Sequence, residues 1–244
     1  MTKRNKSCES EVMLTMQRKE LLKKSAIRHA EYYGMVEVQD ALYADSANKK
    51  IFTDLISIIG SDANIKMAYR NLKSNKGSNT PGVDGKTFKD LAEMSEEALV
   101  RCVRDKILNY QPKAVRRVYI PKPNGKMRPL GIPTVIDRIV QQSVLQVMEP
   151  ICEAKFYRHS YGFRPNRSTK NAVAVCYKLA QVDGFHYVVD VDIKGFFDNV
   201  DHGKLLKQIW TLGIRDKRLI SLIGKMLNCL LYTSDAADDL IGVD

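Results

Sequence analysis

A short β-branched run with two acidic residues inside it lies at residues 187–193 and reads Tyr-Val-Val-Asp-Val-Asp-Ile. β-Branched residues favour a strand, whereas carboxylates are rare inside a core strand. Because side chains alternate along a strand, Asp190 and Asp192 would share one face. Two neighbouring carboxylates need cations or donors to neutralise them, and a divalent metal does this directly. The run therefore predicts either a metal site of the phosphoryl-transfer kind or an edge strand with one solvated face.

The positive charge of the chain is concentrated upstream of this run. The sequence has 39 Lys and Arg against 28 Asp and Glu, a net charge of +11. Residues 101–128 hold nine basic side chains and one acidic, and residues 155–170 hold five basic side chains and no acidic one. Such a basic band predicts a polyanionic partner, with nucleic acid as the first choice. Two solvated basic faces are the alternative.

Composition also bears on the compartment. The five cysteines are widely spaced and odd in number, which favours neither a zinc site nor a disulfide framework. This pattern predicts a reducing, cytoplasmic location. The sequence has no apolar run of the roughly 18 to 20 residues that a membrane helix needs, so we expect no membrane association.

Periodicity and turn residues predict alternating helices and a few strands, which is the α+β or α/β class. Two apolar runs flank Pro-Asn-Gly at residues 123–125, which predicts a cationic β-hairpin over residues 115–133. Thr134 is expected to cap a helix that Pro150 bends or ends. The apolar residues of 169–181 are expected to face inward. Further helices are predicted at 10–33, 50–59, 62–72, 96–108, 202–213 and 216–230.

Four motifs in order carry a resemblance that covers roughly residues 60–230. They are Asn-Thr-Pro-Gly-Val-Asp-Gly at 79–85, Ile-Pro-Lys-Pro-Asn-Gly-Lys at 120–126 continuing to Arg-Ile-Val-Gln-Gln at 138–142, Tyr-Gly-Phe-Arg-Pro-Asn-Arg-Ser at 161–168, and Asp-Ile-Lys-Gly-Phe-Phe-Asp-Asn-Val-Asp-His at 192–202. Together they resemble the reverse transcriptases and maturases encoded by group II introns. The resemblance implies an α+β, right-hand polymerase fold that contains the fingers and the start of the palm, preceded by an N-terminal helical extension.

The resemblance also implies a division of the chain. Residues 1–60 would form the N-terminal helical extension, and residues 61–103 the N-terminal fingers or RNA-binding segment. Residues 104–230 would form the reverse transcriptase domain, with the fingers and the first part of the palm. Residues 231–244 hold four aspartates and no Lys or Arg. We expect this tail to be sequence from outside the family, produced by a frameshift or an assembly artefact.

Catalytic and metal-binding roles are carried over residue by residue. Asp192 resembles the first metal-binding, catalytic aspartate, and the backbone carbonyl of Ile193 a further ligand of Mg²⁺. The resemblance gives no role to Asp190. We therefore expect Asp192 alone, and not both carboxylates of the run, to bind the metal. Asp198 and Asp201 are expected to start a helix instead, where negative charge is favoured.

Substrate-binding roles follow from the same resemblance. Arg116, Lys122 and Arg128 match residues that contact the incoming triphosphate, which suits their charge. Phe197 matches the aromatic residue that packs under the incoming sugar and discriminates against a 2′-OH. The residues expected to bind RNA or template are Lys113, Arg117, Arg164 and Arg167, where the last two could equally support the fingers or be purely structural.

The function implied is that of an RNA-directed DNA polymerase of a mobile group II intron, which extends a primer 3′-OH with dNTPs and Mg²⁺. Intron RNA template, DNA primer and dNTPs would be its partners, and a homodimer is left open. The family's second metal motif, an aromatic-Ala-Asp-Asp turn, is not found, because residues 232–239 lie too close to Asp192 to supply it. We therefore expect this chain to be inactive alone. The alternatives are a non-catalytic maturase module that binds intron RNA and assists splicing, and a DNA-templated or template-independent polymerase.

Overall fold

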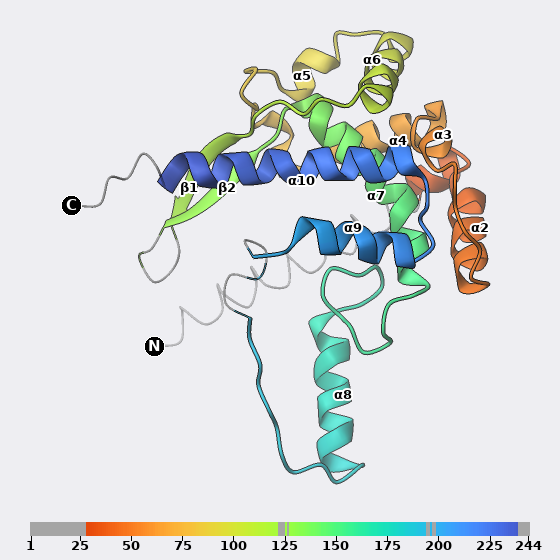
Figure 1. The fold of residues 1–244 in the computed structure, drawn as a ribbon, viewed down its shortest axis with the longest axis vertical. Helices are drawn as coiled ribbons and strands as arrows, with labels where there is room; N and C mark the ends of the chain where they lie inside the picture. The colour runs from red at the N-terminus through yellow and green to blue at the C-terminus, as the bar shows by residue number, and fades with distance from the viewer. Residues whose placement is uncertain (1–27, 122–124, 126, 194–195, 197–198, 239–244) are drawn as a thin grey trace, which may run out of the picture.

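The computed structural model describes residues 28–121, 125, 127–193, 196 and 199–238, and within them the chain is mainly helical with one small antiparallel sheet (Figure 1). This agrees with the α+β class. In chain order the elements are α2 (Val36–Ala47), α3 (Ile56–Ile59), α4 (Asp62–Lys73), the 3-10 helix η1 (Lys76–Asn79), α5 (Phe88–Leu91), α6 (Glu96–Leu108), β1 (Arg116–Pro121), β2 (Met127–Ile132), α7 (Val135–Glu153), α8 (Thr169–Gln181), α9 (His202–Thr211) and α10 (Lys217–Asp238).

Helix starts follow the side chains that the sequence offers there. The first backbone N–H groups of a helix have no partner within the helix, so a side-chain oxygen just before it stabilises the start. The predicted cap at Thr134 is confirmed, and Ser61 and Ser168 cap α4 and α8 in the same way, since each accepts a hydrogen bond from the N–H three residues on. Asp201 caps α9 through Lys204 N at 2.9 Å, and this hydrogen bond lowers the pKa of the Asp201 carboxyl.

Helix α7 is the centre of the core. Its residues Ile139, Val140, Val147 and Ile151 are fully buried. Helices α2, α3, α4 and α6 all pack against it, as Figure 1 shows around the green α7 ribbon. The apolar spacing read from the sequence therefore marks the face of α7 that the surrounding helices cover.

Pro150 does not end α7, because the helix continues to Glu153; that Pro150 bends the helix stays a prediction. A proline has no N–H, so the carbonyl four residues earlier loses its helical partner. That carbonyl belongs to Gln146, and it accepts a hydrogen bond from Gln39 Nε2 on α2 at 3.1 Å. A side chain from another helix thus replaces the bond that the proline removes.

This replacement is testable with a double-mutant cycle. Gln39→Ala is expected to lower the free energy of unfolding by about 1 kcal/mol, the typical value of one such hydrogen bond. In a Pro150→Ala background the helix supplies its own N–H, so the same substitution should have a clearly smaller effect. Urea unfolding of the four proteins measures both values. Equal effects in the two backgrounds would show that Gln39 does not compensate for Pro150.

Two segments far apart in the sequence, at Phe52 and at residues 213–216, are tied together. Phe52 N donates to Gly213 O at 2.9 Å, and Arg215 N donates to Phe52 O at 2.8 Å. Gly213 adopts a φ of 101°, a conformation that a residue with a side chain rarely takes. Beside this bridge, the buried Asp216 accepts hydrogen bonds from the start of α3 and the start of α10. Residues about 160 positions apart are therefore fixed side by side.

The acidic run is extended but does not form a strand of a sheet in the described part of the chain. Val188, Val189 and Val191 are all more than three-quarters exposed. Helix α8, which precedes the run, has no buried residue, so the prediction that its apolar side chains face inward is wrong for this chain. Figure 1 shows α8 projecting away from the packed helices. A strand needs a neighbour to pair its N–H and C=O groups, and local sequence does not supply one.

The core is continuous across positions 60 and 103, because Phe52, Ile65, Val103 and Ile139 belong to one buried cluster. The segment boundaries given by the sequence stay predictions. None of the helices in the described ranges is both long and apolar enough to span a bilayer.

Candidate nucleic-acid interface

The predicted hairpin is confirmed as β1 paired antiparallel with β2. Arg116 faces Ile132 and Ile120 faces Arg128 in this register. Residues two and four apart share a face of a strand, so Arg116 and Arg128 lie on the same face, about 13 Å apart along it. Arg117 lies on the opposite face. The hairpin therefore has cationic positions on both faces.

The loop at residues 76–85 packs closely against the start of α7. A Cβ atom placed on Gly82 would lie 2.7 Å from Thr134 Cα and 2.9 Å from Thr134 N, so only glycine permits this approach. Arg116 Nε donates to Pro81 O at 3.0 Å and so joins the same loop to β1. The loop, the hairpin and the start of α7 thus form one unit.

Arg138 has no role among those that the resemblance implies, yet it has specific partners. Its two terminal nitrogens donate to Gly77 O at 2.9 Å and to Thr80 O at 2.6 Å. Burial lowers the pKa of this guanidinium, while Asp84 acts in the opposite direction. A cation in the first turn of a helix is disfavoured by the helix dipole. The sequence shows a cation at this unfavourable position in the first turn of α7, and this could have indicated that Arg138 has a specific partner.

Arg164 is buried, with 8% of its surface exposed. It forms a two-pronged ion pair with Glu153, with Nε to Oε2 at 2.9 Å and Nη2 to Oε1 at 2.6 Å. Its Nη1 donates to Tyr157 O at 2.7 Å and to Ser160 O at 2.9 Å. Hydrogen bonding to Glu153 raises the pKa of the guanidinium, so its charge is permanent. These contacts favour the structural alternative for Arg164 over template contact.

Arg167 and Lys113 are placed differently from Arg164. Arg167 is half-buried and donates to Arg158 O at 2.9 Å, with its guanidinium 5.8 Å from the centre of the Tyr161 ring. Lys113 has an exposed side chain, and its backbone is fixed. Its N–H donates to Asp137 Oδ2 at 3.3 Å, and its carbonyl accepts from Cys229 Sγ on α10 at 3.2 Å. The exposed cation of Lys113 is therefore carried by a backbone that is hydrogen-bonded on both sides.

Tyr110 lies two residues past the end of α6 and three residues before Lys113. It is 2% exposed. Burial, reinforced by the neighbouring Asp137, raises the pKa of its hydroxyl well above the usual value. The side chain of Lys225 on α10 donates to the Tyr110 carbonyl at 3.0 Å. Helix α10 thus fixes the chain where it leaves α6 toward the hairpin.

The proposed metal ligands lie on the extended run. Asp192 is exposed, and Ile193 is 63% exposed. Within the ranges that the structure describes, no three His, Cys, Asp or Glu residues are close enough to hold a metal ion. Oxygen ligands suit Mg²⁺, so Asp192 and the Ile193 carbonyl fit one part of such a site and not a whole one.

For three of the residues expected to contact the nucleotide, the structure describes the backbone alone or nothing. Lys122 and Phe197 are not among the described residues. Arg128 has a described backbone in β2, but its side chain is not described. Their roles, like those of the other site residues, stay predictions.

Known proteins resemble the chain over these same segments. The profile of the family "Reverse transcriptase (RNA-dependent DNA polymerase)" matches residues 120–238. These residues include the run with Asp192, and they extend past position 231, where the tail was expected to begin.

Three relatives illustrate the similarity. Protein YkfC of Escherichia coli K12 is 43% identical over 166 residues, which are 66% of this chain and 43% of that protein. Group II intron-encoded protein LtrA of Lactococcus lactis is 41% identical over 162 residues, 66% of this chain and 26% of LtrA. The putative COX1/OXI3 intron 1 protein of Saccharomyces cerevisiae is 31% identical over 194 residues, 77% of this chain and 22% of that protein.

The chain thus spans less than half the length of each of these relatives. The family profile, the intron-encoded relatives and the four motifs agree with one another. This chain belongs to the family of reverse transcriptases and maturases encoded by group II introns.

Proposed function

We propose that this chain supplies the fingers and the start of the palm of a group II intron reverse transcriptase, which uses intron RNA as template, a DNA primer and dNTPs. The observation that carries the proposal is the unit formed by the hairpin, the loop at 76–85 and α7, held by Arg116 and Arg138. A rigid hairpin with cations on both faces can hold a polyanion on one side and a triphosphate on the other.

Each group has a defined task in this proposal. Arg116 and Arg128 share the hairpin face assigned to the triphosphate, while Arg117 and Lys113 are assigned to the template backbone. Mg²⁺ would be held in part by Asp192 and the Ile193 carbonyl, and it would supply charge neutralisation for phosphoryl transfer. Arg164 supports the turn at residues 157–164 from within. The cytoplasm is the proposed location.

Binding of RNA tests the electrostatic part of the proposal. The affinity of the chain for single-stranded RNA, measured by fluorescence anisotropy between 50 and 200 mM salt, should fall steeply as phosphate contacts release counterions. Arg117→Ala should reduce the slope of log affinity against log salt by about 1. Lys49→Ala, at an exposed residue outside the hairpin, is the matched control and should leave the slope unchanged. An affinity independent of salt would contradict the proposal.

A second candidate is the maturase module, which binds intron RNA without catalysis. Asp192 is exposed, and within the described ranges it is not joined by two further residues that could bind a metal. This arrangement is the observation that supports the maturase module. With primed RNA template, dNTPs and Mg²⁺, we expect negligible extension by this chain. Selective binding of intron RNA and splicing support that survive Asp192→Ala would identify the maturase module. Robust extension that Asp192→Ala abolishes would identify a complete polymerase instead.

A further inference from the structure

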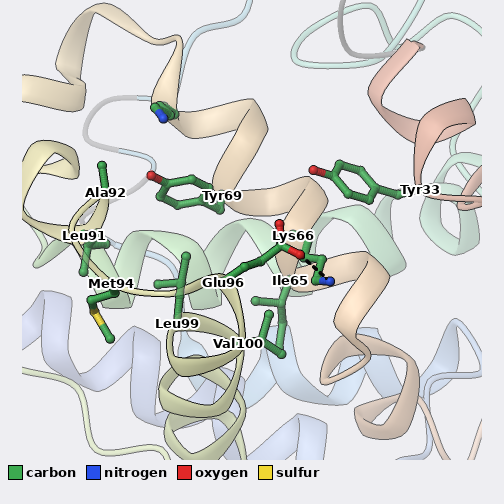
Figure 2. Close-up of a pocket in the computed structure, with 11 residues that line it drawn as sticks. Tyr33, Ile65, Lys66, Tyr69, Leu91, Ala92, Met94, Glu96, Leu99 and Val100 are labelled. Carbon is green, nitrogen blue, oxygen red and sulfur yellow. Dashed lines mark ion pairs between the residues drawn. The ribbon is translucent and has the colours of Figure 1, made fainter.

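A pocket of about 210 Å³ lies between α4, α5 and α6, and none of the residues that line it belongs to the hairpin (Figure 2). Its floor is apolar and buried, and its rim is aromatic and basic. In Figure 2, Tyr69 and Tyr33 flank the ion pair between Lys66 and Glu96. The floor residues are Ile65, Leu91, Leu99 and Val100, and the rim residues include Tyr33, Lys66, Tyr69 and Lys73.

The basic and aromatic residues of the rim continue along α4. Lys66, Tyr69, Arg70 and Lys73 are spaced by three and four residues, so they share one face of the helix. This face carries three cations and one ring. The Arg70 guanidinium lies 4.9 Å from the centre of the Tyr32 ring, and Lys73 Nζ lies 5.5 Å from the centre of the Tyr69 ring. These cation–π contacts restrict the rings without neutralising the cations.

The acidic side chain that lines the pocket, Glu96, already has a partner. Glu96 pairs with Lys66 at 2.5 Å, and this hydrogen bond raises the pKa of the lysine. Asp62 pairs with Arg104. Arg70 and Lys73 take part in none of the ion pairs among the described residues. The charge free to meet a ligand at this rim is therefore positive.

These features narrow the class of ligand. An apolar floor below two tyrosine rings suits a flat aromatic ring, and unpaired cations beside it suit an attached phosphate. The volume admits a single nucleobase but not a duplex. An acidic peptide fits less well, because it has no ring for the floor and would approach the Glu96 carboxylate.

We propose that this pocket binds one unpaired nucleobase of a single-stranded RNA, with the base against Tyr33 and Tyr69 and the flanking phosphates on Arg70 and Lys73. That the strand is RNA rests on the proposed function. That the ligand is one unpaired base rests on the shape and lining of the pocket. Stacking on rings tolerates any base, so this second site would add affinity for unpaired segments without reading sequence.

The test compares substitutions at the ring. Tyr69→Leu keeps an apolar side chain but removes the stacking surface, and it should weaken binding of a mixed-sequence single-stranded RNA by about 5- to 100-fold in fluorescence anisotropy. Binding of a blunt RNA duplex should be unchanged. Tyr69→Phe keeps the ring and should retain the affinity. Tyr177→Leu, at a residue of α8 that is 68% exposed, is the matched control and should have no effect.

The outcomes separate this proposal from the proposed function. Failure of the unsubstituted chain to bind any RNA would overturn both. Salt-dependent RNA binding that Tyr69→Leu leaves unchanged would overturn the pocket proposal alone. An equal loss for single strand and duplex would show a general folding defect of the variant, and then unaltered binding by Tyr33→Leu would overturn the proposal. Competition by poly-glutamate as effective as that by RNA would assign the pocket to an acidic peptide and overturn it too.

Discussion

Replacement of Asp216 by alanine is expected to lower the free energy of unfolding by about 3 to 5 kcal/mol. The side chain is 1% exposed, and both of its carboxylate oxygens accept hydrogen bonds from backbone N–H groups. Oδ2 accepts from Leu55 at 2.8 Å and from Ile56 at 2.9 Å. Oδ1 accepts from Arg218 at 2.9 Å and from Leu219 at 3.3 Å.

These four donors explain the size of the effect. They lie at the starts of α3 and α10, where no helical carbonyl is available to them. Removing the carboxylate leaves them without this acceptor and weakens the link between two segments far apart in the chain. An asparagine at position 216 keeps an oxygen in place, so Asp216→Asn should be less destabilising than Asp216→Ala.

Urea unfolding followed by circular dichroism measures the change. Asp54→Ala is the matched control, because Asp54 is also an aspartate that pairs with Arg218 but lies on the surface. It should shift the unfolding midpoint much less than Asp216→Ala, since an exposed ion pair contributes little and the side-chain hydrogen bond from Ser57 is a single exposed one. Similar midpoints for Asp54→Ala and Asp216→Ala would contradict the role assigned to Asp216.

Replacement of Asn64 by alanine is expected to lower the free energy of unfolding by about 2 to 4 kcal/mol. Asn64 is fully buried between α4 and α7. Its Nδ2 donates to Ile59 O at 2.9 Å and to Ser143 O at 3.0 Å, and its Oδ1 accepts from Gln146 Nε2 at 2.8 Å. Alanine removes these three hydrogen bonds from a buried position and opens a small cavity.

The same measurement decides this case, with Asn75→Ala as the control. Asn75 is exposed just after α4, and its side chain makes no capping hydrogen bond. It should unfold at nearly the same urea concentration as the unsubstituted chain. The Asn64 network continues through Gln146 to Asn71 and then to His29. Asn71→Ala should therefore be non-additive with Asn64→Ala, and simple additivity would argue against one connected network.

Local features could be predicted because they depend on neighbouring residues. A serine or threonine cap needs only an N–H three residues on, and a hairpin needs only a turn between two short runs. The caps at Ser61, Thr134 and Ser168 and the pairing of β1 with β2 were accessible for this reason. The membership in a reverse transcriptase family was accessible as well, because the motifs lie in continuous segments.

Prediction was incomplete or wrong where the partner is distant in sequence. The continuation of α7 past Pro150 depends on Gln39, which lies more than 100 residues away. The acidic run has the alternation of a strand, but pairing requires another strand, and none of the described segments provides it. No local pattern could reveal either outcome.

The sequence by itself determined the identity of the candidate site residues, the basic band and the single carboxylate retained at residue 192. Only the tertiary structure decided which cations are engaged within the protein. Arg164 is held by Glu153, and Arg138 is held by the carbonyls of the loop at 76–85. The physical reason is that charge is a property of a residue type, whereas the partner of a charge depends on which distant segments the core brings together.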